Sequence, residues 1–222
     1  MSQKIQSVIF DMDGVIFDSE RLYANACAAV GEQFGMKDIE NVSKSCIGLN
    51  ERKTYARFKE AYGEDYPEEE FWNAVRAHIR AEKAANGLPV KQGARELLQY
   101  LWRIKGITAA LASSTATPLA MQNLEQAGLD KYFDVIIGGD QIRHGKPAPD
   151  IFLRAAALLR REVQDCAVVE DSYNGVRAAH NAGMTVIMIP DLLPPDDEMR
   201  AKAAVILPSL TEARDYIQKL IY

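Results

Sequence analysis

Cysteine and histidine are both scarce in this chain of 222 residues, which contains three of each. The cysteines, Cys27, Cys46 and Cys166, are odd in number and share no spacing that is typical of a metal site. The pattern therefore indicates neither a disulfide framework nor a cluster of metal-binding cysteines. We interpret the three as buried free thiols in a reducing compartment, and we predict a cytoplasmic protein.

Long apolar segments and an excess of positive charge are also missing. No apolar run is long enough to span a bilayer, and the first residues, with Lys4 and a short apolar stretch broken by Asp11, do not resemble a signal peptide. The net charge is -5 and no basic stripe interrupts it. We therefore expect no membrane and no nucleic-acid partner. An anionic substrate would need a local positive charge, such as a metal, a lysine or a helix N-terminus.

What the chain does contain is an alternation of short apolar runs with helical patterns. Hydrophobic residues make up 48% of it, which is enough for a substantial core. The apolar runs are continuous, as in strands covered on both faces. The predicted strands are Ser7–Phe10, Ile107–Ala112, Val135–Ile137, Ala167–Val169, Thr185–Ile189 and Val205–Ile206, and the helices between them include Ala94–Ile104, Pro118–Ala127, Asp150–Leu159 and Gly175–Ala182. This alternation predicts an α/β fold with a Rossmann-like, doubly wound parallel sheet.

One long segment interrupts the alternation. From about Ser19 to Asn86 helical patterns follow one another without a good strand pattern. Ser19 could cap the first helix, and "YPEEEFW" (residues 66–72) has the proline and acidic residues of a helix start. Because this segment lies between the first strand and the rest of the sheet, we interpret it as an inserted α-helical cap. The predicted domains are an α/β core, residues 1–18 and 87–222, and a cap domain, residues 19–86.

Polar side chains follow four of the predicted strands. In chain order, these groups are Asp11 and Asp13 after the first strand, Ser113, Ser114 and Thr115 after the second, Lys146 beyond the third, and Glu170 and Asp171 after the fourth. Ligands of open α/β sheets bind beyond the carboxyl ends of the strands. We therefore expect these side chains to collect at one edge of the sheet.

This combination of residues suits phosphoryl transfer. Asp11, Glu170 and Asp171 supply the hard oxygen ligands that Mg²⁺ prefers, and a divalent ion would offset the repulsion between crowded carboxylates. Ser113, Lys146 and backbone N–H groups could hold phosphate oxygens. One aspartate could act as nucleophile and a second carboxylate as general acid and base. Taken singly, each feature has a plainer explanation as a loop, a helix cap or a surface charge, but their coincidence at four strand ends favours a site.

Four motifs in these segments resemble those of the haloacid dehalogenase superfamily. "DMDGVIFDSE" (residues 11–20) resembles its first motif and "LASST" (residues 111–115) its second. Lys146 in "GKPAPDIF" is similar to the third motif, and "VVEDSYNGVRAAHNAGM" (residues 168–184) to the fourth. The motifs occur in family order over nearly the whole chain. A helical insert directly after the first motif resembles the subgroup with a small helical cap, which includes β-phosphoglucomutase and sugar-phosphate phosphatases.

The resemblance implies catalytic and metal-binding roles. Asp11 would be the nucleophile and a Mg²⁺ ligand. Asp13 would be the general acid and base, and its backbone carbonyl would also bind the metal. Asp171 would be the third protein ligand, with Glu170 bound to the metal directly or supporting it. Gly14 would allow the sharp turn that follows the two acids.

The resemblance also implies a phosphate site and a lid. Ser113, the backbone N–H of Ser114, and Lys146 would hold the transferring phosphoryl group. The cap would close over the substrate and exclude bulk water.

Two activities of the superfamily fit this sequence poorly. A haloacid dehalogenase resembles the chain in its nucleophile but lacks a second acid such as Asp13 and needs no metal. A phosphonate hydrolase would need a Schiff-base lysine from the cap. The cap lysines, which we interpret as solvated surface charges, are Lys37, Lys44, Lys53, Lys59 and Lys83.

β-Phosphoglucomutase is the main alternative to a phosphatase. The mutase has a histidine shortly after its first motif, where this chain has Tyr23, although Tyr23 could equally be a helix-packing residue. The mutase also has a cap arginine for a second phosphate, and at the matching place in "GLNERKTY" (residues 48–55) this chain has Glu51, with Arg52 one position later. A shift of one residue turns a helical side chain by about 100°. These differences favour a phosphatase.

A non-enzymatic receiver domain is a second alternative, in which Asp140 after the third strand would accept the phosphoryl group. The helical insert and the paired aspartates have no place in such a domain. The sequence therefore predicts a Mg²⁺-dependent phosphatase that acts through an aspartyl-phosphate on small phosphorylated metabolites, with sugar phosphates as the expected substrates. Its partner would be a small-molecule phosphate ester, and the protein would be a monomer or a weak dimer.

Overall fold

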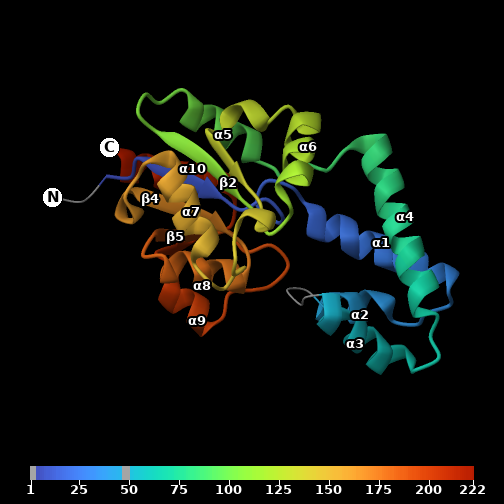
Figure 1. Ribbon diagram of the computed structural model, residues 1–222. Helices are drawn as coiled ribbons and strands as arrows, with labels where there is room; N and C mark the ends of the chain where they lie inside the picture. Colours follow the sequence, from blue (N-terminus) through green and yellow to red (C-terminus); the bar gives the residue numbers. More distant parts are fainter. Residues whose placement is uncertain (1–3, 47–50) are drawn as a thin grey trace. The chain divides into compact units, whose positions relative to one another are not determined.

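A computed structural model of the protein describes residues 4–46 and 51–222 and divides the chain into two compact units (Figure 1). The core unit contains Met1–Phe17 and Val90–Tyr222, and the cap unit contains Asp18–Pro89. The chain therefore passes between the units twice. The cap expected at residues 19–86 falls within the second unit.

The core unit is built on a six-stranded sheet with the order β3-β2-β1-β4-β5-β6, and every neighbouring pair is parallel. The strands are β1 (Ser7–Phe10), β2 (Thr108–Ala112), β3 (Val135–Ile137), β4 (Cys166–Glu170), β5 (Thr185–Met188) and β6 (Val205–Ile206). The predicted α/β fold is confirmed. The chain adds β2 and β3 on one side of β1 and then returns to place β4 on the other, so the topological switch lies between β1 and β4.

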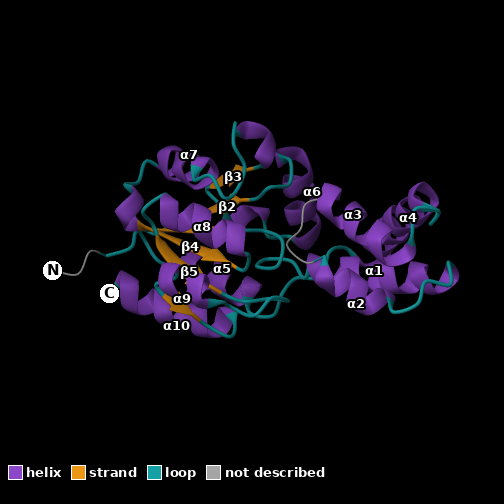
Figure 2. Cartoon of the chain, turned by 90° about the horizontal axis from the view of Figure 1, so that it is seen from below, coloured by secondary structure: helices purple, strands orange, loops and turns teal. Residues whose placement is uncertain are grey.

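Helices cover the sheet, as Figure 2 shows. α7 (Asp150–Leu159) packs on β1, β2 and β3, α8 (Tyr173–Asn181) packs on β4 and β5, and α5 (Ala94–Trp102) packs on β2 and on α10 (Leu210–Ile221). In α5 the buried residues are Ala94, Leu97, Leu98 and Leu101, a spacing that puts one apolar stripe on the sheet. The other core elements are α6 (Thr117–Ala127), α9 (Asp197–Lys202) and the 3₁₀ turns η1 (Asp130–Tyr132), η2 (Gly139–Gln141) and η3 (Val163–Asp165).

The regular secondary structure of the cap unit, within its described residues, is entirely helical. Its helices are α1 (Ser19–Gln33), α2 (Ile39–Ser45), α3 (Glu51–Tyr62) and α4 (Glu68–Asn86). Phe58, Phe71 and Trp72 are buried at its centre, and the ring centroids of Phe58 and Trp72 are 4.6 Å apart. Ser19 does not cap α1, because it is already the first helical residue and Asp18 occupies the cap position. The cap unit thus has an apolar core of its own.

The register of the sheet decides which groups meet at its carboxyl edge. Phe10 at the end of β1 lies opposite Leu111 of β2 and Val169 of β4. The next residue, Asp11, therefore emerges level with the last residues of the two neighbouring strands, and its backbone N–H donates to the carbonyl of Val169 at 3.0 Å. The buried central strand delivers its first carboxylate to the topological switch point.

Candidate active site

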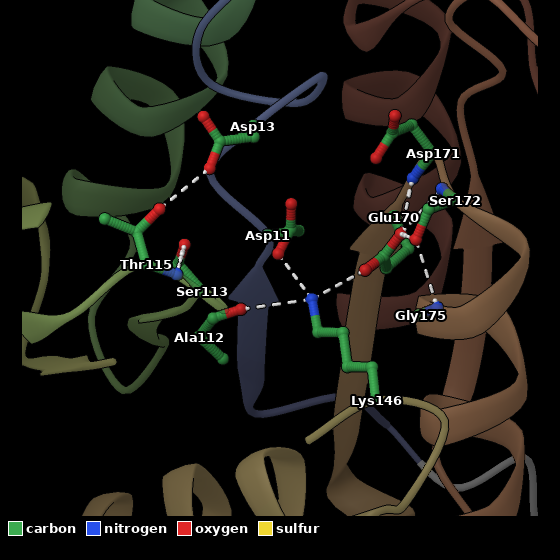
Figure 3. A network of polar contacts seen from close by, with 10 residues as sticks. All are labelled: Asp11, Asp13, Ala112, Ser113, Thr115, Lys146, Glu170, Asp171, Ser172 and Gly175. Carbon is green, nitrogen blue, oxygen red and sulfur yellow. Dashed lines mark hydrogen bonds and ion pairs between the residues drawn. The ribbon is translucent and has the colours of Figure 1, made fainter. Parts of the chain in front are cut away.

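Three charged side chains form the centre of the site, and all three are nearly inaccessible to solvent. The Lys146 ammonium donates to Asp11, to Oε1 of Glu170 at 2.7 Å, and to the carbonyl oxygen of Ala112 at 3.3 Å (Figure 3). The side chains of Lys146, Asp11 and Glu170 are 7%, 9% and 0% exposed. One buried cation therefore serves two buried carboxylates, which leaves this part of the site with an excess of negative charge.

Burial and the neighbouring carboxylates shift the pKa values of these groups. Burial raises the pKa of the Asp11 carboxyl to about 7, and the charges of Glu170 and Asp13 act in the same direction, whereas Lys146 opposes them. Burial likewise raises the pKa of Asp171 well above its usual range, with Glu170 and Asp11 adding to the effect. Burial acts to lower the pKa of Lys146, but the two carboxylates outweigh it and its pKa is raised. An additional cation would relieve the repulsion among the acids.

Glu170 is held by donors on both of its oxygens. Its Oε2 accepts hydrogen bonds from the backbone N–H groups of Asp171 and Ser172, each at 2.8 Å, and from the Ser172 hydroxyl at 3.0 Å. Ser172 in turn caps α8 by accepting from the N–H of Gly175. A Cβ atom at Gly175 would overlap the Glu170 carboxylate, so glycine is needed there. The start of α8 therefore fixes the Glu170 carboxylate that holds Lys146.

Asp171 is the carboxylate best suited to act as a metal ligand. Its Oδ1 is buried and has no hydrogen-bond partner, which is unusual for a carboxylate oxygen. Oxygens of Asp11, Glu170 and Asp171 all lie within 4.8 Å of one another. These hard oxygen donors, an unpartnered buried atom among them, fit the coordination preferences of Mg²⁺. Within the described part of the chain, this is the one group of acids, cysteines or histidines that meets a metal-site geometry.

Asp13 is at the same edge but outside that group of three carboxylates. Its Oδ2 accepts a hydrogen bond from Thr115 Oγ1 at 3.2 Å, and Figure 3 shows its carboxylate above Asp11. The following residue, Gly14, has φ +79°, and a Cβ atom there would overlap the Asp171 carboxylate. Glycine therefore lets the loop after β1 turn sharply against the end of β4. The contact with Thr115 was not predicted, because nothing in the motif spacing shows which hydroxyl faces Asp13.

The loop after β2 places its two serines differently. Ser113 is fully buried and its Oγ accepts from the backbone N–H of Thr115 at 3.0 Å, so that bond does not use the hydroxyl hydrogen. Ser114 is exposed. Neither Ser114 nor Thr115 caps α6, which begins at Thr117 with Ala116 in the cap position.

Asp140 has a structural role beside this loop. Its Oδ1 accepts from the backbone N–H of Thr117 at 2.7 Å and from the Thr117 hydroxyl at 2.8 Å. These bonds lower the pKa of Asp140. A carboxylate already bound to the start of α6 is a poor match for the phosphate-accepting aspartate of a receiver domain.

The remaining candidates lie mostly in the cap unit. Tyr23 stacks on Trp72, with ring centroids 6.3 Å apart, and Trp72 is buried. His144, in the core unit, is exposed and pairs with Asp150 at 3.0 Å. None of the five cap lysines is buried. Residues 48–50 and the side chain of Glu51, on which the second-phosphate argument depends, lie outside what the structure describes.

Comparison with known proteins identifies the family. The model of the haloacid dehalogenase-like hydrolases matches residues 8–189. The chain belongs to this family. A phosphorylated carbohydrates phosphatase of Thermotoga maritima is 36% identical to this hydrolase over 181 residues, which cover 81% of the chain and 82% of that protein. The family assignment made from the four motifs is confirmed.

Solved structures of other proteins share the architecture of this hydrolase. A HAD family hydrolase from Deinococcus radiodurans with bound phosphate and sodium has a TM-score of 0.84 at 26% identity, covering 98% of this chain and 97% of that one. A protein of Thermotoga maritima that is provisionally described as a β-phosphoglucomutase has a TM-score of 0.79 at 31% identity, covering 96% and 98%. No helix within the described residues is both long enough and apolar enough to cross a membrane.

Proposed function

We propose that this hydrolase is a Mg²⁺-dependent phosphatase of small phosphorylated carbohydrates, with Asp11 as nucleophile and Asp13 as general acid and base. The observation that carries the proposal is the buried Asp11 carboxylate at the topological switch point, held by Lys146 on one oxygen and facing Asp13 and Asp171 (Figure 3). The relative named as a phosphorylated carbohydrates phosphatase supports the substrate class.

The first half of the reaction transfers the phosphoryl group to the protein. A carboxylate oxygen of Asp11 attacks phosphorus and forms an aspartyl-phosphate while the bond to the leaving oxygen breaks. Asp13 gives its proton to that oxygen, so a neutral alcohol departs. Lys146, the Ser113 hydroxyl and the Ser114 N–H neutralise charge on the phosphoryl oxygens.

The second half returns the protein to its starting state. Asp13, now ionised, takes a proton from water as the water oxygen attacks phosphorus, and the bond to Asp11 breaks. Asp11, Asp171 and the Asp13 carbonyl would hold Mg²⁺, while Glu170, with both oxygens already bound by donors, would orient Lys146 and the start of α8. When bound, the ion supplies positive charge for the phosphoryl oxygens and for the crowded carboxylates. Inorganic phosphate is the product.

Phosphosugar mutase activity is the second candidate, favoured by the similarity to the protein provisionally described as a β-phosphoglucomutase. A mutase would share the first half-reaction but return the phosphoryl group to another hydroxyl of the sugar. Tyr23, which occupies the place of the mutase histidine and packs on Trp72, favours hydrolysis.

The proposal is tested by one assay on a panel of sugar phosphates with Mg²⁺, including β-glucose 1-phosphate, in which free phosphate and glucose 6-phosphate are followed together. We expect phosphate without the isomer. Asp11→Asn should abolish turnover without lowering the melting temperature, whereas Asp150→Asn, which removes an acid paired with the exposed His144, should keep the full rate. Turnover by Asp11→Asn would refute the nucleophile, and glucose 6-phosphate forming faster than free phosphate would establish the mutase.

A further inference from the structure

Lys91 lies next to the second passage of the chain between the two units. Its backbone N–H donates to the carbonyl of Ile16 at 2.9 Å, and the preceding residue, Val90, forms an antiparallel bridge with Phe17. The segment that leads into α5 is therefore fastened to the end of the loop that carries Asp13. No motif includes Lys91, and its distance from that loop in the sequence hides the contact.

The side chain of Lys91 reaches further into the same loop. Its ammonium donates to the carbonyl oxygen of Gly14 at 2.7 Å and forms an ion pair with Oδ1 of Asp191 at 2.7 Å. The two side chains are only 17% and 5% exposed, and Oδ2 of Asp191 is buried without a hydrogen-bond partner. A largely buried ion pair with an unsatisfied oxygen is costly to stability. This cost indicates a role for the pair beyond packing.

Gly14 is held on both sides of its Cα atom. Its N–H donates to the carbonyl of Phe17 at 2.8 Å, and its own carbonyl accepts from Lys91. Asp171 fills the space on the third side, where a Cβ atom would lie. With both peptide groups fixed, the backbone of Asp13 has little freedom, and its carboxylate is kept in reach of Thr115.

The charge of Lys91 also affects the carboxyl group of Asp171. Burial raises the pKa of Asp171, and the Lys91 ammonium is one of the two positive charges that oppose this rise. The residue that holds the Gly14 carbonyl thus also acts on the carboxylate of Asp171, which follows β4.

We propose that Lys91 and Asp191 form a positioning pair that holds the Gly14 carbonyl and thereby fixes Asp13 for proton transfer. The inference rests on the proposed function, because it assigns Asp13 the role of general acid. The pair acts through the backbone, so its loss should impair the step that needs a proton from Asp13 more than the attack by Asp11.

Two phosphate esters separate these steps. The alcohol of a sugar phosphate must be protonated as it leaves, whereas p-nitrophenolate leaves without a proton. The experiment measures, by rapid quench with Mg²⁺, the first-turnover rate of p-nitrophenyl phosphate and of the panel sugar phosphate that the wild type hydrolyses fastest. In Lys91→Met we expect the rate on the sugar phosphate to fall about tenfold or more relative to the rate on the aryl ester, since small misplacements of catalytic groups cost up to about 100-fold.

A second variant guards against a simple loss of stability. Lys91→Met leaves Asp191 buried and unpaired, whereas the double variant Lys91→Met/Asp191→Leu removes both charges. We expect the double variant to show the same selective loss. Arg177→Met is the matched control, because Arg177 pairs with Glu198 at 2.5 Å and fastens α8 to α9 without touching the Asp13 loop. It should change both ester rates by the same factor.

The outcomes separate this inference from the proposed function. Equal losses on the two esters in Lys91→Met, or a wild-type ratio of rates in the double variant, would overturn the positioning role and leave the phosphatase intact. A wild-type protein that hydrolyses neither ester would overturn the phosphatase and the inference together.

Discussion

Protons and Mg²⁺ should compete for the same carboxylates, and this competition can be measured without any substrate. In the metal-free protein, burial raises the pKa of Asp11 from 3.8 to about 7. A group with a raised pKa stabilises the fold while it is protonated, so its contribution is complete below the unfolded value of 3.8 and is lost as the pH rises through about 7. Asp171 shifts in the same direction. The metal-free protein should therefore gain stability from these two acids as the pH falls from 8 to 6.

Binding of Mg²⁺ has the opposite dependence, because the ion needs ionised ligands. Below a pKa of about 7, each pH unit should weaken binding about tenfold if one proton is displaced, and more if Asp171 also releases one. With Mg²⁺ in excess, a tenfold change is about 1.4 kcal/mol of stabilisation. For a chain of this size that corresponds to about 3–5 °C in melting temperature.

The assay is thermal unfolding at pH 6 and pH 8, each with EDTA and with excess Mg²⁺. The Mg²⁺-induced rise in melting temperature should be larger at pH 8 by at least the amount given above. Asp171→Asn, which removes the carboxylate that has an unpartnered buried oxygen, should shrink the rise at both pH values, and Asp150→Asn should not. An equal Mg²⁺ effect at pH 6 and pH 8 would refute the idea that the raised pKa of Asp11 belongs to a metal ligand.

Two further predictions concern the packing of buried residues and need no substrate. Gly175→Ala should lower the free energy of unfolding by about 1–3 kcal/mol, because the new methyl group would overlap the buried Glu170 carboxylate. Gly145→Ala, where the new methyl group would meet open space, is the control. Equal urea midpoints for the two variants would contradict the prediction. Burial raises the pKa of Cys27 to about 12 and of Cys166 to about 11, so their contribution to stability should be complete below pH 9 and decline above it. Iodoacetamide labelling at pH 8 followed by mass spectrometry should modify these two thiols only after denaturation. Rapid labelling of the native protein would show that the thiols are accessible and would contradict the prediction.

The sheet could be predicted closely because its strands are buried on both faces and appear in the sequence as continuous apolar runs. β1, β3 and β6 have the predicted bounds. Helix ends are less certain, since they depend on single caps: α8 begins at Tyr173 rather than Gly175 because the Ser172 hydroxyl accepts from the Gly175 N–H. The meeting of Asp11, Lys146 and Glu170 followed from parallel topology, which collects the carboxyl ends of strands at one edge.

Contacts between loops could not be predicted in this way. Thr115 reaches Asp13, and Lys91 reaches Gly14 and Asp191, only because particular backbone angles turn separate loops toward one another. "DLLPPDDE" (residues 191–198) has the composition of a surface loop, yet its first side chain is almost fully buried. Neither periodicity nor motif spacing encodes these contacts between loops, because the contacts form only after the sheet has brought the loops together.

The two passages of the chain between the units are neighbours. Phe17 bridges Val90, and the N–H of Asp18 donates to the carbonyl of Pro89 at 2.8 Å. With respect to the core unit, the cap unit is an insertion whose two ends are held together. It therefore behaves as one long loop, and each doubling of the length of such a loop costs only about 0.6 kcal/mol of closure entropy. A helical unit with an apolar core of its own can be lengthened, shortened or exchanged at this point while the sheet of the core unit keeps its register. Changes within the cap unit are thus energetically separate from changes at the sheet edge that carries the buried carboxylates.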